Sequence, residues 1–415
     1  MTDVSCDVCI VGAGPAGMTL ALLLVRSGIT VTVVERTRSL DREFRGEILQ
    51  PGGQAILDEL GVLDAARERG SYEHDRFVLS ERGRTLINAD YRTLPGPRNY
   101  LLSIPQRHLV AELLARCEKQ PGFSYLDGTR VGELVEDSGR VTGVVCRGAG
   151  ADQVVRARLV VGADGRYSKV RQLAGIDAGR TEMFDQDVLW FKLPVQGPPP
   201  RDVRVFRAGG NPVLAYGSAP GSVQIGWTLP HRGYQDMASK GFGHVKERLC
   251  AAASEYAEQI DAELTGFKDL SLLDVFAGCA NEWVRDGLLL IGDSAHTFGP
   301  IGAQGINLAV QDAAMAHPVL VDALGRGDTS AAALRPFVAA RRPAIDRMFR
   351  IQRIQSGAML STGKVASAVR PRMAAVVSRT PLYRLMLRQI AFGDPAIRVH
   401  SELFRAHARH SKHSL

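Results

Sequence analysis

The fold of this chain is decided by the stretch Asp7-Val8-Cys9-Ile10-Val11-Gly12-Ala13-Gly14-Pro15-Ala16-Gly17. Its first half is an apolar run typical of a buried strand, and its second half carries glycines in the spacing G-x-G-x-x-G. A helical pattern follows over residues 18–26, and a second apolar run over residues 30–34 ends at Glu35. This order of strand, glycine turn, helix, strand and acid predicts a βαβ dinucleotide-binding unit.

Each part of the turn has a physical role in such a unit. Gly12 permits the tight turn, Gly14 lets the backbone approach a pyrophosphate, and Gly17 lets the helix pack closely on the strand. The helix that begins beside Ala16 presents unpaired N–H groups and the positive end of its dipole to the phosphates. Glu35 is placed to accept hydrogen bonds from a ribose.

Loops with a similar character follow later in the chain. The polar segment after the second strand, residues 36–45, ends at Arg45, which is a candidate for a phosphate or ring contact. Two further apolar strands end at the turns Asp164-Gly165 and Gly292-Asp293. Because parallel strands of one sheet present their carboxyl ends at the same edge, we expect these loops to face one cofactor.

Composition and charge exclude several classes of protein. The 415 residues are 45% hydrophobic and 23% charged, which is typical of a soluble globular protein. The sequence has no apolar run of the roughly 18 residues that span a bilayer and no signal-peptide pattern, which favours a cytoplasmic location. The net charge of +7 is uneven, since residues 331–415 hold 16 Lys and Arg against three acids. Those arginines are scattered among apolar helical residues, which favours a solvated helical surface over nucleic-acid binding, with peripheral membrane contact as the alternative.

The six cysteines are scattered along the chain, as in proteins of a reducing compartment. Cys6-x-x-Cys9 has the spacing of a redox or zinc half-site. It lies on the first predicted strand, however, and no second Cys or His pair follows at metal-ligand spacing. We therefore expect buried structural thiols and no metal.

Three ordered motifs make the chain similar to the p-hydroxybenzoate hydroxylase family, the single-component FAD-dependent aromatic hydroxylases. They are the glycine turn at residues 12–17, the Asp-Gly motif at residues 162–171, and Gly292-Asp293 with its continuation Pro300…Gly305…Asn307. One such motif is common to many nucleotide-binding proteins, whereas the three in this order are specific.

The resemblance implies an α/β fold in which an antiparallel-sheet substrate domain is inserted into a Rossmann-type FAD-binding domain and a C-terminal helical segment follows. Residues 1–180 would form the first part of the FAD-binding domain, with inserted hairpins, and residues 276–325 its return segment. Residues 181–275, with strands rich in Val, Leu, Trp and Tyr, would form the substrate sheet, and residues 326–415 the helical region. A monomer or a homodimer is compatible with this division.

The resemblance also implies roles for matched positions. Glu35 would hold the adenosine ribose, and Arg107 and Arg45 would contact the FAD backbone. Asp164 would serve FAD and the pyrophosphate of transiently bound NADH or NADPH, and Asp293 the phosphate or ribityl region. The other cofactor-binding positions that it implies are Gly12, Gly14, Ala16, Gly17, Arg36, Gly165, Gly292, Gly302, Ala303, Gly305 and Asn307.

The loop that carries Pro300, Gly302 and Gln304 would lie against the flavin ring. Reduced flavin carries negative charge near N1 and O2, where the helix that follows this loop offers N–H groups and a positive dipole end. Ala303 stands where the family often has glycine, a departure that could tighten the loop. The sequence marks no catalytic base.

The family mechanism would begin with reduction of FAD by NAD(P)H. O₂ would then add to give a C4a-hydroperoxide, and one oxygen atom would pass to an electron-rich substrate while water is lost. A second G-x-G-x-x-G after a strand is absent from the sequence, which argues against two-dinucleotide disulfide reductases and Baeyer–Villiger enzymes. We expect an NAD(P)H:oxygen oxidoreductase that hydroxylates a hydrophobic aromatic or polycyclic small molecule, such as a secondary metabolite.

The substrate is expected between the second-domain sheet and the flavin ring. Trp190, Phe206, Tyr216 and Trp227 are the candidates that could line this pocket, and His231 is a further one.

Other functions remain compatible with the motifs. A flavin-dependent halogenase shares the FAD fold, but its Trp-x-Trp-x-Ile-Pro motif is represented here by the single-tryptophan stretch Trp227-Thr228-Leu229-Pro230. A geranylgeranyl-reductase-like isoprenoid reductase would bring the basic C-terminal region to a membrane. A flavin-binding protein without turnover is the alternative of another class, and the intact phosphate loops argue against it.

Overall fold

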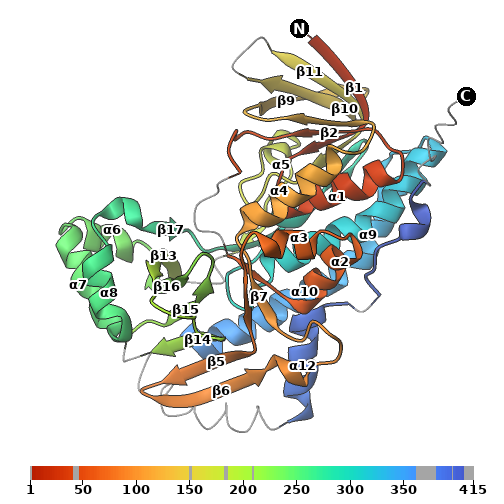
Figure 1. The fold of residues 1–415 in the computed structure, drawn as a ribbon. Helices are drawn as coiled ribbons and strands as arrows, with labels where there is room; N and C mark the ends of the chain where they lie inside the picture. The colour runs from red at the N-terminus through yellow and green to blue at the C-terminus, as the bar shows by residue number, and fades with distance from the viewer. Residues whose placement is uncertain are drawn as a thin grey trace, which may run out of the picture.

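The computed structural model describes residues 2–40, 46–148, 152–181, 186–207, 210–360, 380–394 and 396–405. Two large sheets organise these residues, one in the upper part of Figure 1 and one in its lower left part. Among the described helices, none is both long enough and apolar enough to cross a membrane.

The first large sheet, with eight strands in the described residues, is built around the predicted βαβ unit. Its central strand lies parallel to its two neighbours, which buries both faces and explains the runs of Val, Ile and Leu. A hairpin extends from one of these neighbours, as the sequence predicts. The strands are β1 (Thr2–Val11), β2 (Val31–Val34), β8 (Phe123–Leu126), β9 (Arg130–Asp137), β10 (Arg140–Arg147), β11 (Gln153–Gly162), β19 (Val284–Arg285) and β20 (Leu288–Leu290).

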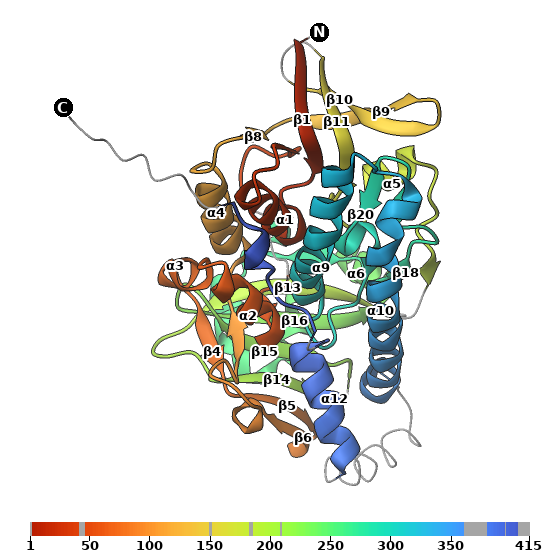
Figure 2. The same cartoon turned by 90° about the vertical axis from the view of Figure 1, so that its right-hand side faces the viewer.

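Four helices pack beside this sheet: α1 (Pro15–Arg26), α4 (Gln106–Cys117), α9 (Gly305–Arg326) and α10 (Ala331–Leu360). α1 contacts α4 and α9, and α9 in turn contacts α10, which runs beside it in Figure 2. Phe337 and Met348 of α10 belong to the same apolar core as β1 and α1. The first helix of the region predicted to be helical, residues 326–415, therefore completes this core.

The later part of the predicted helical region, from residue 361 onward, lies partly outside the described residues. Its described part includes α12 (Pro381–Phe392), which packs against α2 (Pro51–Glu59). α12 lies at the lower edge of the molecule in Figure 1, near β5 and β6.

The second large sheet has seven strands in the described residues, in the order β17-β13-β16-β15-β14-β5-β6. Five of them come from the predicted substrate segment: β13 (Gln186–Pro194), β14 (Asp202–Arg207), β15 (Val213–Ser218), β16 (Ser222–Pro230) and β17 (Ser271–Leu273). The other two form the hairpin of β5 (Arg76–Glu81) and β6 (Arg84–Asp90), and β5 pairs in parallel with β14. The boundaries 1–180 and 181–275 are corrected accordingly: the hairpin belongs to the substrate sheet, because β14 offers it an open edge.

This sheet buries a different core on each face. Its outer face is covered by α6 (Gly233–Ala238), α7 (Phe242–Ala252) and α8 (Ala257–Glu263), which lie at the left of Figure 1. Its inner face carries Val188, Trp190 and Tyr216, and Ile301 and Ala303 from the loop before α9 pack against them. The inner face is therefore the one that meets the loop predicted to hold the flavin ring.

Shorter elements connect these layers. They are α3 (Leu63–Glu68), α5 (Lys169–Leu173), β3 (Ile48–Leu49), β4 (Tyr72–His74), β7 (Leu101–Ser103), β12 (Arg180–Thr181), β18 (Ala277–Cys279), β21 (His296–Thr297), and the 3-10 turns η1 (Tyr91–Thr93), η2 (Ser254–Tyr256), η3 (Phe267–Asp269), η4 (Gly292–Ser294) and η5 (Ser401–Leu403).

Candidate active site

The glycine turn lies at the carboxyl end of β1, and the segment after β11 packs directly on it. Gly12 has a φ of +106°, and a Cβ atom there would lie 2.5 Å from the carbonyl oxygen of Ala163. Glycine alone fits this position. A Cβ atom at Gly17 would lie 2.1 Å from the carbonyl oxygen of Gly12, which confirms the close packing of helix on turn. Gly14 is the N-cap of α1, so the free N–H groups of that helix begin at this turn.

Glu35 is buried at the end of β2 and supports the turn from behind. One carboxylate oxygen accepts a hydrogen bond from the N–H of Ala13 at 2.8 Å, and the other accepts one from the hydroxyl of Thr37 at 2.8 Å. The carboxylate therefore fixes the turn, and its predicted contact with the adenosine ribose stays a prediction. Arg36 is exposed beside it, whereas Arg45 lies outside the described residues.

The Asp-Gly and Gly-Asp motifs meet through Ser294. The Asp164 carboxylate accepts hydrogen bonds from the N–H groups of Lys169 and Val170, at 2.6 and 3.1 Å, and from the Ser294 hydroxyl at 3.1 Å. The N–H of Gly165 donates to the same hydroxyl oxygen at 3.0 Å. Asp164 therefore caps α5 and ties the two motifs together, while its role toward FAD and NAD(P)H stays a prediction.

Gly292 and Asp293 bring the third motif against the first. Gly292 has a φ of +60°, and a Cβ atom there would lie 3.1 Å from the methyl group of Ala16 on α1. The Asp293 side chain is 31% exposed, with Nε of Arg166 4.0 Å from its carboxylate. Within the described residues no hydrogen bond engages this carboxylate, so its oxygens can accept hydrogen bonds from a bound nucleotide.

A buried charged cluster beneath Gly292 was missed by the sequence analysis. Asp312 of α9 is fully buried and accepts a hydrogen bond from the Gly292 N–H at 2.7 Å. It also bonds to Nε2 of His296 at 2.7 Å and to Nε of Arg341, from α10, at 2.6 Å. Burial by itself would raise the pKa of Asp312, but the charges of His296 and Arg341 outweigh it and lower the pKa to about 2. The available signal was an acid within an apolar helical stretch, which needs a buried partner.

Side-chain amides hold the loop before α9 in place. The carbonyl of Gly302 accepts hydrogen bonds from Nε2 of Gln50 and from Nε2 of Gln304, both at 2.9 Å. Nε2 of Gln352 donates to the two carbonyls that flank Pro300, at 3.0 and 2.6 Å. Gln50 and Gln352 come from α2's N-cap and from α10, so the loop is fixed by distant parts of the chain.

The side chains of Gln304 and Asn307 point into the protein. Gln304 is 1% exposed and its amide also donates to the carbonyl of Ile390 on α12 at 2.9 Å. Asn307 is fully buried and accepts a hydrogen bond from the Gly53 N–H at 2.6 Å. The Gln304 amide therefore donates to carbonyls within the protein, and the predicted place of Gln304 in a loop against the flavin ring stays a prediction. Ala303 has a φ of +51°, so it keeps the left-handed conformation that glycine favours at this position.

These residues fit an extended flavin nucleotide. A Cβ atom at Gly165 or Gly305 would have no neighbour within 4 Å, so the backbone at both positions is accessible to a ligand. The first N–H groups of α1 and α9 lack acceptors within their helices and can bind a pyrophosphate and a negatively charged ring edge. Asp293 adds a carboxylate that can accept hydrogen bonds from hydroxyl groups.

Arg107 lies at the start of α4. It is exposed, and together with Leu40, Arg69, His108 and Ala111 it lines a pocket of about 300 Å³. Burial lowers the pKa of His108. The arginines give the pocket a positive charge that suits a phosphate, and the predicted contact of Arg107 with the FAD backbone stays a prediction.

The four aromatic substrate candidates divide between the two faces of the seven-stranded sheet. Trp190 and Tyr216 lie on the inner face, with ring centroids 6.4 Å apart. Trp227 and Phe206 lie on the outer face, against the core that α6–α8 cover. Trp227 and Phe206 are therefore corrected to core residues. Successive residues of a strand alternate between faces, and the sequence does not indicate which face meets the cofactor.

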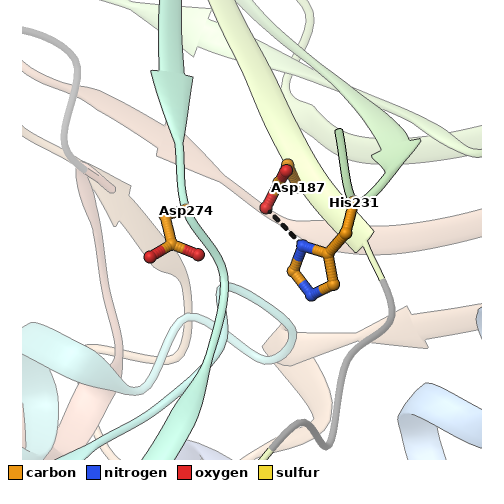
Figure 3. Close-up of side chains that lie close together, drawn as sticks. All are labelled: Asp187, His231 and Asp274. Atoms are coloured by element: carbon orange, nitrogen blue, oxygen red, sulfur yellow. Dashed lines mark hydrogen bonds and ion pairs between the residues drawn. The ribbon is translucent and has the colours of Figure 1, made fainter. Parts of the chain in front are cut away.

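Figure 3 shows three side chains close together: Asp187 at the start of β13, His231 after β16 and Asp274 after β17. Their ligand atoms lie within 4.8 Å of one another, as at a metal site. Asp187 is, however, bonded to Nδ1 of His231 at 2.8 Å, and Asp274 accepts hydrogen bonds from Tyr167 and Arg180. Because these carboxylates have protein partners and Arg180 adds a positive charge, we interpret the cluster as a contact between the sheet and the Asp-Gly motif.

Comparisons with known proteins agree with this geometry. A sequence profile described as "FAD binding domain" matches residues 5–352. The chain is 64% identical over 398 residues to 6-methylpretetramide 4-monooxygenase of Streptomyces rimosus, which covers 96% of this chain and 95% of the relative.

Solved structures are similar over nearly the whole chain. P. aeruginosa PqsL in complex with 2-aminobenzoylacetate has a TM-score of 0.76 at 25% identity, covering 90% of this chain and 99% of that one. p-Nitrophenol 4-monooxygenase PnpA from Pseudomonas putida has a TM-score of 0.78 at 20% identity, covering 95% and 99%. The chain, with its three motifs brought to one edge of a Rossmann-type sheet, belongs to the p-hydroxybenzoate hydroxylase-like family of FAD-dependent aromatic monooxygenases.

Proposed function

We propose that this enzyme hydroxylates a fused-ring aromatic metabolite, with NADH or NADPH as reductant and O₂ as the source of the oxygen atom. The first substrate to test is 6-methylpretetramide, because the relative named for it is 64% identical over 96% of this chain. By the same analogy, carbon 4 is the position to test for oxygenation.

One observation carries the proposal: an aromatic inner face meets the loop before α9. Trp190 and Tyr216 lie in the same apolar cluster as the side chains of Val188 and Leu101, and Ala303 of the loop packs against it. Flat apolar rings pack well against such side chains. This face therefore suits a polycyclic aromatic substrate beside the ring of the cofactor.

FAD, when bound, would be reduced by NAD(P)H and would then activate O₂. The chain supplies the rest. The start of α9 provides N–H donors and a positive dipole end for the ring edge that becomes negative, and Asp293 accepts hydrogen bonds from the nucleotide. Gln50 and Gln352 hydrogen-bond to carbonyls of the loop, and a loop held in position beforehand lowers the cost of reorganisation. The apolar inner face excludes water from the reacting atoms.

The test uses the purified holoenzyme with 6-methylpretetramide, NADH or NADPH, and labelled O₂. We expect oxidation of the reduced nicotinamide to accelerate when the substrate is added, and the product to gain one labelled oxygen atom by mass spectrometry. A chlorinated product that depends on chloride would support a halogenase instead. Reduction of the substrate without oxygen incorporation would support an isoprenoid-type reductase, and no reduction of bound flavin by either nucleotide would support a binding protein.

A further inference from the structure

The inner face of the seven-stranded sheet carries the ammonium group of Lys192 beside its buried aromatic side chains. On β13, Leu189, Phe191 and Leu193 belong to the outer core, whereas Trp190 belongs to the inner one. Because strand residues alternate between faces, Lys192 lies on the inner face next to Trp190. Its side chain is 24% exposed, so the ammonium group is accessible to a small molecule.

A buried carboxylate holds this ammonium group in place. Nζ of Lys192 lies 2.7 Å from Oε1 of Glu47, and the hydroxyl of Ser218 donates to Oε2 of Glu47 at 2.6 Å. The Glu47 side chain is 8% exposed. Glu47 is the partner that the described residues give Lys192, and an ammonium group has three N–H donors. Two donors of Lys192 are therefore left for solvent or a ligand.

A second observation at the same place points to a ligand. Gln224 of β16 stands opposite Lys192 on one side and opposite Tyr216 on the other in the sheet register. It is fully buried, yet neither its amide oxygen nor its amide nitrogen has a hydrogen-bond partner in the described part of the chain. The indole N–H of Trp190 is equally unpartnered. Buried polar groups without partners are costly, and native structures contain few of them.

We propose that Lys192 binds the ionised hydroxyl of the aromatic substrate, a phenolate or enolate oxygen, with Gln224 beside it to recognise the same polar edge. The proposal rests on the proposed function and deepens it by assigning the residue that binds the substrate's hydroxyl group. The Lys192 ammonium group would stabilise the negative charge on the substrate oxygen.

This binding step moves one proton and no electrons. The substrate O–H bond breaks, the proton leaves to solvent water as the ligand binds, and the ionised oxygen accepts hydrogen bonds from the two remaining N–H donors of Lys192, which stays protonated beside Glu47. An ionised ring is richer in electrons and reacts faster with the electrophilic oxygen that the flavin supplies. An opposite charge within about 4–6 Å lowers the pKa of an acid by roughly 1–3 units.

The neighbouring titratable groups do not compete for this role. Burial, and then the charge of Glu47, raise the pKa of Tyr216 well above its ordinary value, so this phenol stays neutral. Burial lowers the pKa of His74, whose ring centroid lies 6.2 Å from that of Tyr216, to about 4. Lys192 is therefore the positive group placed to face a ligand oxygen here.

The experiment measures ligand ionisation in the oxidised holoenzyme, without reductant, so that no turnover is needed. The probes are 6-methylpretetramide and alizarin, a dihydroxyanthraquinone whose visible absorption shifts on ionisation. In the wild-type enzyme we expect the pKa of the bound probe to be lower than in water by about 1 unit or more. Lys192→Met should abolish this shift and weaken binding about tenfold, and Lys192→Arg should keep most of the shift.

Lys246 supplies a matched control. Its side chain is 22% exposed and paired with Asp261 at 2.9 Å, but it lies on α7, beyond the outer face. Lys246→Met should leave both the shift and the binding unchanged. Gln224→Leu should weaken binding of the probe without lowering the free energy of unfolding, because it removes an unpartnered amide.

Two outcomes overturn the inference: a probe whose pKa is equally low on wild type and on Lys192→Met with bound FAD retained, or no shift on wild type. If Lys192→Met loses its FAD, the comparison of wild type with Lys192→Gln and Lys192→Arg decides, since the arginine variant alone should keep the shift. A wild-type enzyme that ionises the probe but makes no hydroxylated product would contradict the proposed function and leave the role of Lys192 standing.

Discussion

At the scale of single residues, the acids of this site divide by their partners. The carboxylates of Glu35 and Asp164 accept hydrogen bonds from N–H and hydroxyl groups of the protein, and so they stabilise the shape of the loops. Asp293 is partly exposed and has no hydrogen bond to its carboxylate within the described residues. A carboxylate in that state is free to serve the cofactor, and its loss should therefore affect binding more than folding.

Asp293→Ala is expected to weaken FAD binding about tenfold, because one to two hydrogen bonds to the nucleotide are lost. The free energy of unfolding of the apoprotein should change by less than about 0.5 kcal/mol. Titration of flavin fluorescence measures the affinity. Asp346→Ala, which removes a 53% exposed acid from α10, is the control and should bind FAD normally; equal affinities for both variants would count against the role of Asp293.

The buried carboxylate of Asp312 leads to a prediction about the stability of the protein at low pH. Its pKa is lowered to about 2, so its stabilising contribution is complete above its unfolded pKa of 3.8 and is lost as the pH falls from there toward 2. In urea unfolding, the stability difference between wild type and Asp312→Asn should shrink by about 2 kcal/mol between pH 6 and pH 2. Asp322→Asn, an exposed acid on the same helix at 61% exposure, should show no such change. A difference that stays constant with pH would refute the assignment.

At the scale of elements, the position of the loop before α9 depends on how α2 and α9 meet. The N–H of Gly53 on α2 donates to the side-chain oxygen of Asn307 on α9, and Gln50 at the N-cap of α2 holds the carbonyl of Gly302. α12 adds the carbonyl of Ile390, which accepts from Gln304. The loop is thus held by α2, α10 and α12, which are far apart from it in the sequence.

Gly53→Ala tests this contact. A Cβ atom at Gly53 would lie 2.7 Å from the side-chain oxygen of Asn307 and 2.8 Å from a methyl group of Leu49, so these side chains or α2 must shift and the hydrogen bond to Asn307 is disturbed. We expect a loss of about 1–3 kcal/mol in the free energy of unfolding and weaker FAD binding. Gly243→Ala on α7, where a Cβ atom meets nothing within 4 Å, should be neutral or slightly stabilising. Thermal unfolding with and without FAD distinguishes the two, and equal behaviour would contradict the prediction.

At the scale of the whole molecule, the substrate sheet is assembled from two separate parts of the chain. β5 and β6 come earlier in the chain than most strands of the first sheet. β5 pairs with β14 in a six-residue parallel register from Arg76↔Asp202 to Glu81↔Arg207. Glu47, which precedes β3, then joins Lys192 and Ser218 of the same sheet. Neither large sheet is therefore complete without strands from both sides of the domain boundary.

A fragment of residues 181–275 is accordingly expected not to fold alone, because β14 would expose an unpaired edge. The same fragment with residues 72–93 joined to it by a flexible linker should gain β structure and solubility, since the hairpin covers that edge. Circular dichroism and gel filtration measure both properties. A monomeric, cooperatively unfolding 181–275 fragment would show that the hairpin is dispensable.

The sequence by itself determined the local structure and the motifs. The strand, glycine turn, helix and acid at the amino terminus follow from hydrophobic period and from the steric need for glycine at Gly12, and both act within a few residues. The predicted hairpins and the strands of the substrate segment were found for the same reason. The meeting of the three motifs was also predictable, because parallel strands share one carboxyl edge.

Only the tertiary structure determined which side chains from distant elements contact each other. It placed Trp190 on the inner face and Trp227 on the outer one, because alternation along a strand fixes two faces but not which face meets the flavin loop. It brought Arg341 to Asp312 and Lys192 to Glu47 across long stretches of chain. Such pairings depend on the path of the backbone between elements, which no local pattern of residues encodes.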